Sequence, residues 1–160
     1  MITPVAVTPN NDLELVLARL MDVRPDALFR CWTDPALLAQ WFAPEPLTTE
    51  ILQMDVRPGG SSRIVMRGPD GAEYPASGVY LEVVPNSRLV FTDAFTEAWV
   101  PSAKPFMTAE VTFEPRDGGT LYTARARHWT AEDRDAHVKM GFHEGWGLCA
   151  EQLARLAATL

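Results

Sequence analysis

Apolar and polar residues alternate over much of the chain between residues 48 and 128. This period of two is typical of antiparallel strands that have one buried face and one face in water. It predicts strands at about 48–56, 61–67, 73–84, 88–95, 106–114 and 120–128, and the mostly apolar residues 13–21 predict another strand before them. The strand at 106–114 is the clearest case, with Met107, Ala109, Val111 and Phe113 on one face.

Turn residues separate these strands and favour hairpins. Proline, which fixes φ, and residues that tolerate positive φ occur together at 57–60, 69–71 and 85–87, and the turn at 116–119 has an aspartate and two glycines after Pro115. The long connection at 94–105 also contains prolines, and we expect it to act as a lid. The sequence therefore predicts an antiparallel sheet with one face that needs a cover.

Helical spacing of apolar residues occurs in two regions outside these strands. A first short helix begins at Pro25 and ends at Asp34, and Asp34 then caps a second short helix that ends before Pro44. Thr130 and Asp133 resemble a capping box and open a further helical segment. The closing helix, at about 142–158, carries an apolar face that covers the sheet: Phe142, Trp146, Cys149, Leu153, Leu156 and Leu160.

Glycines cluster at the start of this closing helix, at positions 141, 145 and 147. Each glycine costs a helix about 1 kcal/mol relative to alanine, so such a cluster needs a reason. Close approach of another backbone or of a ligand would supply one, and the sequence leaves both readings open.

Composition and charge indicate one domain and argue against nucleic-acid and membrane-spanning classes of protein. The 160 residues suit one domain, and the net charge of −7 without a basic cluster argues against a nucleic-acid partner. Residues 1–12 contain prolines and asparagines and predict a flexible leader before a domain at 13–160. No apolar run is long enough to span a bilayer and no basic leader is present, so we expect a cytoplasmic protein.

The order of elements and several local motifs carry a family resemblance. The motifs are Trp32–Pro35, Met54–Gly60, Gly78–Pro85, Arg88–Thr92 and Gly141–Gly147. Together they resemble the family named after the activator of the heat-shock-chaperone ATPase, within the START-like (SRPBCC) superfamily. The resemblance implies an α+β helix-grip fold, in which a curved antiparallel sheet of about seven strands holds the long C-terminal helix on its concave face. It also implies a cavity between sheet and helix that accepts an apolar molecule.

Aromatic and apolar side chains are the candidates to line such a cavity. A concave apolar enclosure is the usual place for a small molecule to bind. The expected ligand-binding residues come from the second short helix, the strands, the long connection and the last helix: Trp41, Met66, Tyr80, Trp99, Phe113, Tyr122, Phe142, His143 and Trp146.

Polar residues near these positions leave an enzyme reading open. Tyr80 and Glu82 are two residues apart and would share one strand face, and His143 starts the last helix. If they converged in the cavity, they could act as acid and base in a polyketide cyclase or hydrolase type of reaction. A solvated Glu82 and a structural His143 are the competing interpretations.

Other kinds of site have no support in the sequence. The histidines and cysteines have no metal-ligand spacing, and no glycine-rich phosphate loop occurs, so no metal or cofactor is expected. Three functions remain: a module that binds a small apolar molecule, an enzyme that uses the same cavity, and a protein that contacts a heat-shock chaperone, which the single domain makes less favoured. A homodimer is compatible with each of them.

Overall fold

The computed structural model describes residues 2–160 and contains one large antiparallel sheet. Its eight strands are arranged in the order β1-β2-β10-β9-β6-β5-β4-β3. A separate pair of short strands, β7 (Phe95–Glu97) and β8 (Val100–Pro101), lies between β6 and β9 along the chain. The strands of the large sheet are β1 (Ile2–Val5), β2 (Glu14–Met21), β3 (Thr48–Met54), β4 (Ser61–Arg67), β5 (Glu73–Val84), β6 (Arg88–Thr92), β9 (Met107–Arg116) and β10 (Gly119–His128).

The helices begin at the caps that the sequence predicts. Helix α1 (Pro25–Thr33) has proline in its first turn, and the Asp34 side chain caps α2 (Pro35–Leu38) by accepting a hydrogen bond from Ala36 N. Thr130 caps α3 (Ala131–Lys139) by accepting from Asp133 N, which confirms Thr130 as the N-cap. Helix α4 (Phe142–Ala157) follows α3 after a short break.

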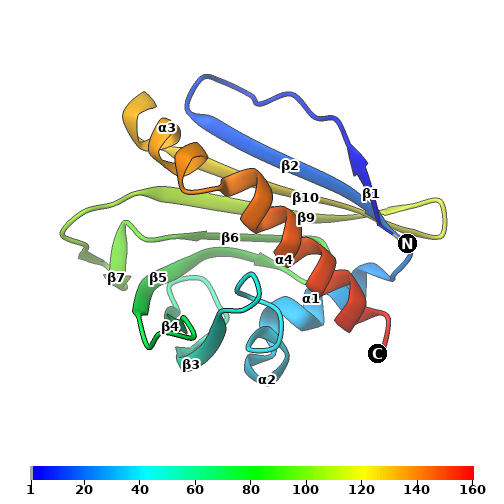
Figure 1. Cartoon of the computed structure of the whole chain (residues 1–160), viewed down its shortest axis with the longest axis horizontal. Coiled ribbons are helices and arrows are strands. Elements are labelled where there is room, and N and C mark those ends of the chain that lie inside the picture. Colours follow the sequence, from blue (N-terminus) through cyan, green and yellow to red (C-terminus); the bar gives the residue numbers. More distant parts are fainter. Residues whose placement is uncertain (1) are drawn as a thin grey trace.

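The sheet is curved, and α4 crosses its concave side (Figure 1). Helices α1 and α2 close one end of this concave side, and α3 lies at the opposite end of α4 (Figure 1). The α+β helix-grip fold is therefore confirmed, with eight strands in the main sheet instead of about seven. No helix within residues 2–160 has the length and apolarity needed to cross a membrane.

The first strand corrects the expectation of a flexible leader at residues 1–12. Strand β1 pairs antiparallel with β2, and Ile2 lies opposite Met21 in the register. Further along, Asn10 N donates to the Glu14 carboxylate at 3.0 Å. The edge of β2 would otherwise leave its backbone groups without partners, so this segment gains hydrogen bonds although its sequence has no strand pattern.

The outer face of the sheet is polar and carries ion pairs. Glu14 is buried there, and Arg125 and Arg127 from β10 both contact its carboxylate. Burial alone would raise the pKa of Glu14, but the hydrogen bonds from Asn10 N and from Arg125 outweigh this cost and lower the pKa. The arginines of β10 thus pair with acidic residues and do not form a free basic surface.

Helix α4 packs most closely on one half of the sheet. It contacts β2 and α1, where Leu153 is fully buried. Gly147 lies at this contact: a Cβ at this position would be 3.2 Å from the Arg19 guanidinium, the end of a flexible side chain, and 3.8 Å from Leu17 Cδ1. Gly141 has a different role: its φ of +91° forms the break between α3 and α4, a conformation that side chains disfavour.

The different roles of Gly141 and Gly145 can be tested by replacing each with alanine. We expect Gly141→Ala to lower the free energy of unfolding by about 1–2 kcal/mol, because alanine is strained at positive φ. Gly145 lies inside α4, and an added Cβ would meet no heavy atom within 4 Å. Gly145→Ala should therefore raise stability by about 0.5–1 kcal/mol through helix propensity. Urea unfolding of both variants checks the opposite signs, and a shift in the same direction would contradict the assignment.

Candidate ligand cavity

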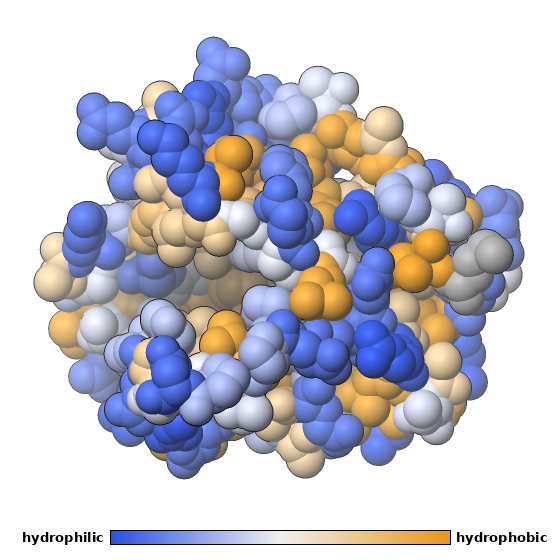
Figure 2. All heavy atoms as spheres, viewed as in Figure 1, coloured by the Kyte–Doolittle hydropathy of each residue, from blue (hydrophilic) through white to orange (hydrophobic). Residues whose placement is uncertain are grey.

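A cavity of about 570 Å³ lies between α4 and the half of the sheet that α4 does not cover. Figure 2 shows a hollow in this face of the molecule, next to the helix. Tyr74 on β5 and Met140 before α4 are both lining residues and are 51% and 73% exposed, which places them at the opening. The volume is in the range of pockets that hold small organic molecules, about 300–1,000 Å³.

Most of the lining side chains are aromatic or aliphatic. They come from α1, α2, the central strands and the first turns of α4, so the wall combines segments that are distant in sequence. The large apolar members are Trp32, Leu38, Trp41, Phe42, Leu47, Ile64, Met66, Val79, Phe91, Phe106, Met107, Met140, Phe142 and Trp146.

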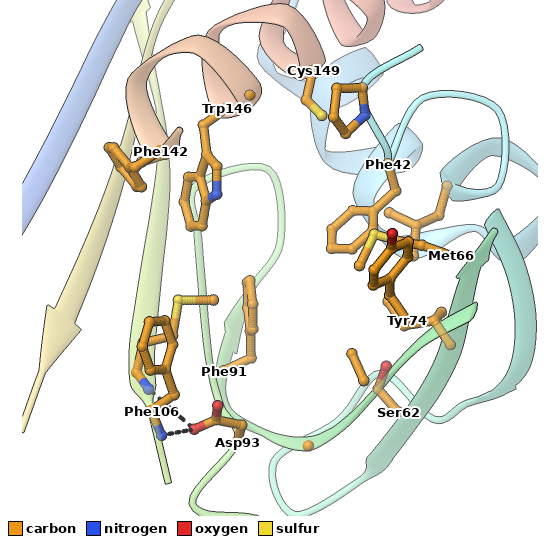
Figure 3. Close-up of a pocket in the computed structure, with 18 of the residues that line it drawn as sticks. Phe42, Ser62, Met66, Tyr74, Phe91, Asp93, Phe106, Phe142, Trp146 and Cys149 are labelled. Carbon is orange, nitrogen blue, oxygen red and sulfur yellow. Dashed lines mark hydrogen bonds between the residues drawn. The ribbon is translucent and has the colours of Figure 1, made fainter. Parts of the chain in front are cut away.

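The aromatic rings form two facing walls (Figure 3). On one side Phe142 and Trp146 extend from α4, with ring centroids 4.6 Å apart. Phe42 and Tyr74 lie on the opposite side, and Phe91 stands on β6 between the two walls (Figure 3). A flat apolar molecule could contact ring faces or edges on both sides, which is a favourable geometry for aromatic groups.

A buried glutamine holds part of the second wall in place. Gln152 on α4 donates to Trp41 O at 3.0 Å and to Ala43 O at 2.8 Å. Its Oε1 accepts from Glu45 N at 3.0 Å. The side chain is therefore fully paired, and it ties the segment that carries the cavity residue Phe42 to the helix.

Two tyrosines of the sheet, Tyr80 and Tyr122, are among the lining residues. Burial raises the pKa of Tyr80 to about 12, a shift that a hydrogen bond with Ser62 opposes. Burial also raises the pKa of Tyr122. Both phenols are therefore neutral at physiological pH and can donate or accept a hydrogen bond without carrying charge.

A pair of histidines lies at the α3 end of the cavity. His128 Nδ1 is 2.9 Å from Leu13 O, and His128 Nε2 is 2.9 Å from His137 Nδ1. Since a carbonyl oxygen only accepts, Nδ1 of a neutral His128 donates and its Nε2 accepts. His137 Nδ1 is then the donor, so the lone pair of a neutral His137 is on Nε2. Burial and the neighbouring His128 lower the pKa of His137 to about 4, so this ring is neutral at pH 7.

Asp93, directly after β6, is the only charged side chain among the described residues that line the cavity. Its Oδ1 accepts hydrogen bonds from Phe106 N at 2.8 Å and from Met107 N at 3.1 Å (Figure 3). Within residues 2–160, no hydrogen bond or ion pair engages its other oxygen, Oδ2. One carboxylate oxygen is thus structural and the other is free.

Most of the expected ligand-binding residues come together in this lining. They are Trp41, Met66, Tyr80, Tyr122, Phe142 and Trp146. Whether they bind a ligand stays a prediction, but their positions around one cavity agree with the expected arrangement. Trp99, Phe113 and His143 do not line it.

Trp99 lies on the other side of the sheet. Its side chain is 61% exposed, and its ring packs edge-on against Phe95 at 5.5 Å. Strand β7 packs on β4 and β5, beside Arg63. Arg63 points away from the cavity, because its neighbours on β4, Ser62 and Ile64, line the cavity and successive side chains of a strand alternate. The connection at 94–105 therefore folds onto the outer face and does not form the expected lid.

Phe113 and His143 are also outside the lining, for different reasons. Phe113 is fully buried in the main core, where its ring meets Phe29 and Tyr122, each at 5.9 Å. His143 is exposed on the first turn of α4, next to the buried Phe142. Its direction could not be read from helical spacing alone.

The expected catalytic group of Tyr80, Glu82 and His143 does not form. A β-bulge between Tyr80 and Glu82 shifts the register against β6, so Tyr80 lies opposite Phe91 whereas Glu82 lies opposite Val90. Glu82 consequently points to the outer face, where it pairs with Arg88 at 3.2 Å. Without the bulge, the two residues would share a face, which was the basis of the expectation.

The sequence interpretation missed Asp93, His137, Phe91 and Phe106. Phe91 could have been found by strand alternation, since it is one of the inward positions of β6. Asp93 and His137 follow no local pattern, because their places depend on how the β6 end and α3 fold back on the sheet.

The lining offers neither a reactive thiol nor, among the described residues, a metal site. Burial raises the pKa of the lining residue Cys149 to about 12, so its thiol is protonated. Within residues 2–160 no group of histidine, cysteine and acidic side chains has a geometry that could hold a metal ion.

Comparison with known proteins identifies the family. The sequence profile of the family described as "Activator of Hsp90 ATPase homolog 1-like protein" matches residues 22–158. The chain belongs to this family. Its residues 22–158 include the cavity, α4 and both histidines, so the whole AHSA1-like site lies in the matched region.

Solved structures agree with this AHSA1-like assignment. A crystal structure of a protein from Nitrosomonas europaea is 39% identical and has a TM-score of 0.90, covering 94% of this chain and 97% of that chain. A protein from Mycobacterium smegmatis is 25% identical with a TM-score of 0.81, covering 96% of both chains. The AHSA1-like protein from Aeromonas hydrophila, at 19% identity and a TM-score of 0.67, covers 91% of this chain and 92% of its own and shares the fold. None of the curated proteins compared with the chain matches it.

The histidine pair predicts a pH dependence of stability. The unfolded chain takes up a proton on His137 near pH 6.5, whereas the folded chain does so only at about pH 4. The stability present above pH 6.5 is therefore lost as the pH falls through this window, by roughly 2–3 kcal/mol for this residue. Urea unfolding between these pH values measures the slope.

The matched variant is His137→Asn, because its amide can still donate to His128 Nε2 but cannot titrate. We expect a clearly smaller loss of stability on acidification in this variant. His143→Asn, at an exposed position, should retain most of the loss. Equal slopes in the parent chain and in His137→Asn would disprove the role of His137.

Proposed function

We propose that this AHSA1-like chain binds a small apolar or aromatic molecule in the cavity between α4 and the sheet. The observation that carries the proposal is the cavity itself, which has about 570 Å³ of space, apolar walls and an opening at the surface. Filling such a space removes apolar area from water on both partners, at about 25 cal/mol per Å². The few polar groups of the lining would orient the molecule.

The other two candidate functions have less support. An enzyme of the cyclase or hydrolase type would need convergent acid and base groups, and Glu82 and His143 point away from the cavity. A heat-shock chaperone as partner is supported by the family's name alone. We therefore place ligand binding first.

A neutral apolar dye such as phenylnaphthylamine tests the proposal. We expect its fluorescence to rise on binding to the parent chain. Gly145 lines the cavity and has open space in front of it, so Gly145→Leu should fill part of the site and weaken the affinity about tenfold or more. The control Glu151→Leu adds the same side chain at an exposed position of α4 and should bind the dye normally. Equal affinities for both variants would place the dye elsewhere and overturn the proposal.

A further inference from the structure

The one charge of the described cavity lining is negative, whereas an acidic ligand would need a positive one. Arginine and lysine are absent from the described lining, and Asp93 supplies its one charge. An anionic ligand would bring its charge near this carboxylate without a cation to balance it, which is costly in an apolar site. The cavity therefore disfavours fatty acids and aromatic carboxylates.

Asp93 Oδ2 can accept a hydrogen bond from a ligand, because Oδ1 is already bound by the backbone. The backbone N–H groups of Phe106 and Met107 bind Oδ1 and fix the carboxylate plane, so no reorganisation is needed to present Oδ2. Figure 3 shows Asp93 below Phe91 and next to Phe106, at the lower edge of the view. An ammonium group at Oδ2 would make a charge-assisted hydrogen bond, which is stronger than one between neutral groups.

His137 adds a second acceptor beside the same ring. Its Nδ1 is used by His128, and within residues 2–160 no donor reaches its Nε2. The His137 ring is 5.1 Å from that of Phe106, whose backbone N–H binds Asp93. Thus a carboxylate oxygen and a neutral imidazole nitrogen, both acceptors, flank Phe106 in the lining.

The aromatic rings of the lining also suit a cationic ligand. Phe91, Phe106 and Trp146 present aromatic groups to the cavity, and a cation within about 6 Å of a ring face is attracted to it. The net charge of −7 on the chain also raises the local concentration of cationic ligands relative to anionic ones.

We propose that the ligand is a hydrophobic amine, with its apolar body between the aromatic walls and its ammonium group at Asp93 Oδ2. This inference rests on the proposed binding function and specifies its ligand class. A neutral alcohol could use the same acceptors more weakly, whereas a carboxylate could not.

Three naphthalene derivatives of similar size separate these cases: naphthylmethylamine, naphthylmethanol and naphthoate. Titration calorimetry at about pH 7, where the amine is a cation and the acid an anion, gives their affinities. We expect the amine to bind about tenfold more tightly than the alcohol, and the carboxylate to bind most weakly.

Asp93→Asn is the decisive variant. Its amide oxygen can still accept from Phe106 N and Met107 N, so the loop keeps its anchor, but the charge is lost. The preference for the amine over the alcohol should fall to within about threefold. Glu82→Gln removes the same charge from the outer face and should keep the full preference.

The outcomes distinguish the two proposals. If the alcohol binds as tightly as the amine in the parent chain, or if Asp93→Asn keeps the full preference, the amine assignment is wrong and cavity binding stands. If neither these compounds nor the neutral dye bind, the binding function fails and the amine assignment fails with it.

Discussion

The close packing of α4 on one half of the sheet is the constraint on which the rest of the structure depends. Helix α4 contacts β2 and α1, Gly147 lies beside Leu17 and Arg19 of β2, and Leu153 of α4 is fully buried. Because a straight helix cannot follow a curved sheet, contact on the β2 side leaves space on the β5 side. The cavity is therefore a consequence of where the contacts with β2 and α1 fix the helix.

Buried polar groups keep this space from closing. An apolar cavity tends to collapse, since its walls gain contacts by moving together. Gln152 holds the segment at 41–45 through hydrogen bonds to its backbone, and the His128–His137 pair links β10 to α3 on the other side. Removing one partner would leave a buried polar group unsatisfied, which costs about 1–3 kcal/mol, so the walls stay where these bonds place them.

The sequence predicts the elements of this fold well and its site only in part. Alternation identifies most strands between residues 48 and 128, the apolar run at 13–21 identifies β2, and caps such as Thr130 identify helix starts. Alternation fails where one residue is inserted: the bulge after Tyr80 turns Glu82 outward although its spacing suggests the opposite. It also cannot place residues outside regular elements, which is why Trp99 was assigned to the cavity and Asp93 was missed.

The apolar walls and the single charged side chain of the cavity differ in how strongly they can select one ligand over another. Burial of apolar area favours any molecule that fits, because this energy depends on surface and not on chemical identity. In the proposed complex, rings such as Phe142 and Trp146 would therefore supply affinity but little discrimination. Discrimination requires a group that is favourable for one ligand and unfavourable for another. In the described lining, Asp93 is the one charged side chain, and its carboxylate would attract a cation and repel an anion. Under the proposed function, the charge of this one loop residue would thus decide between ligands that the walls alone would accept equally.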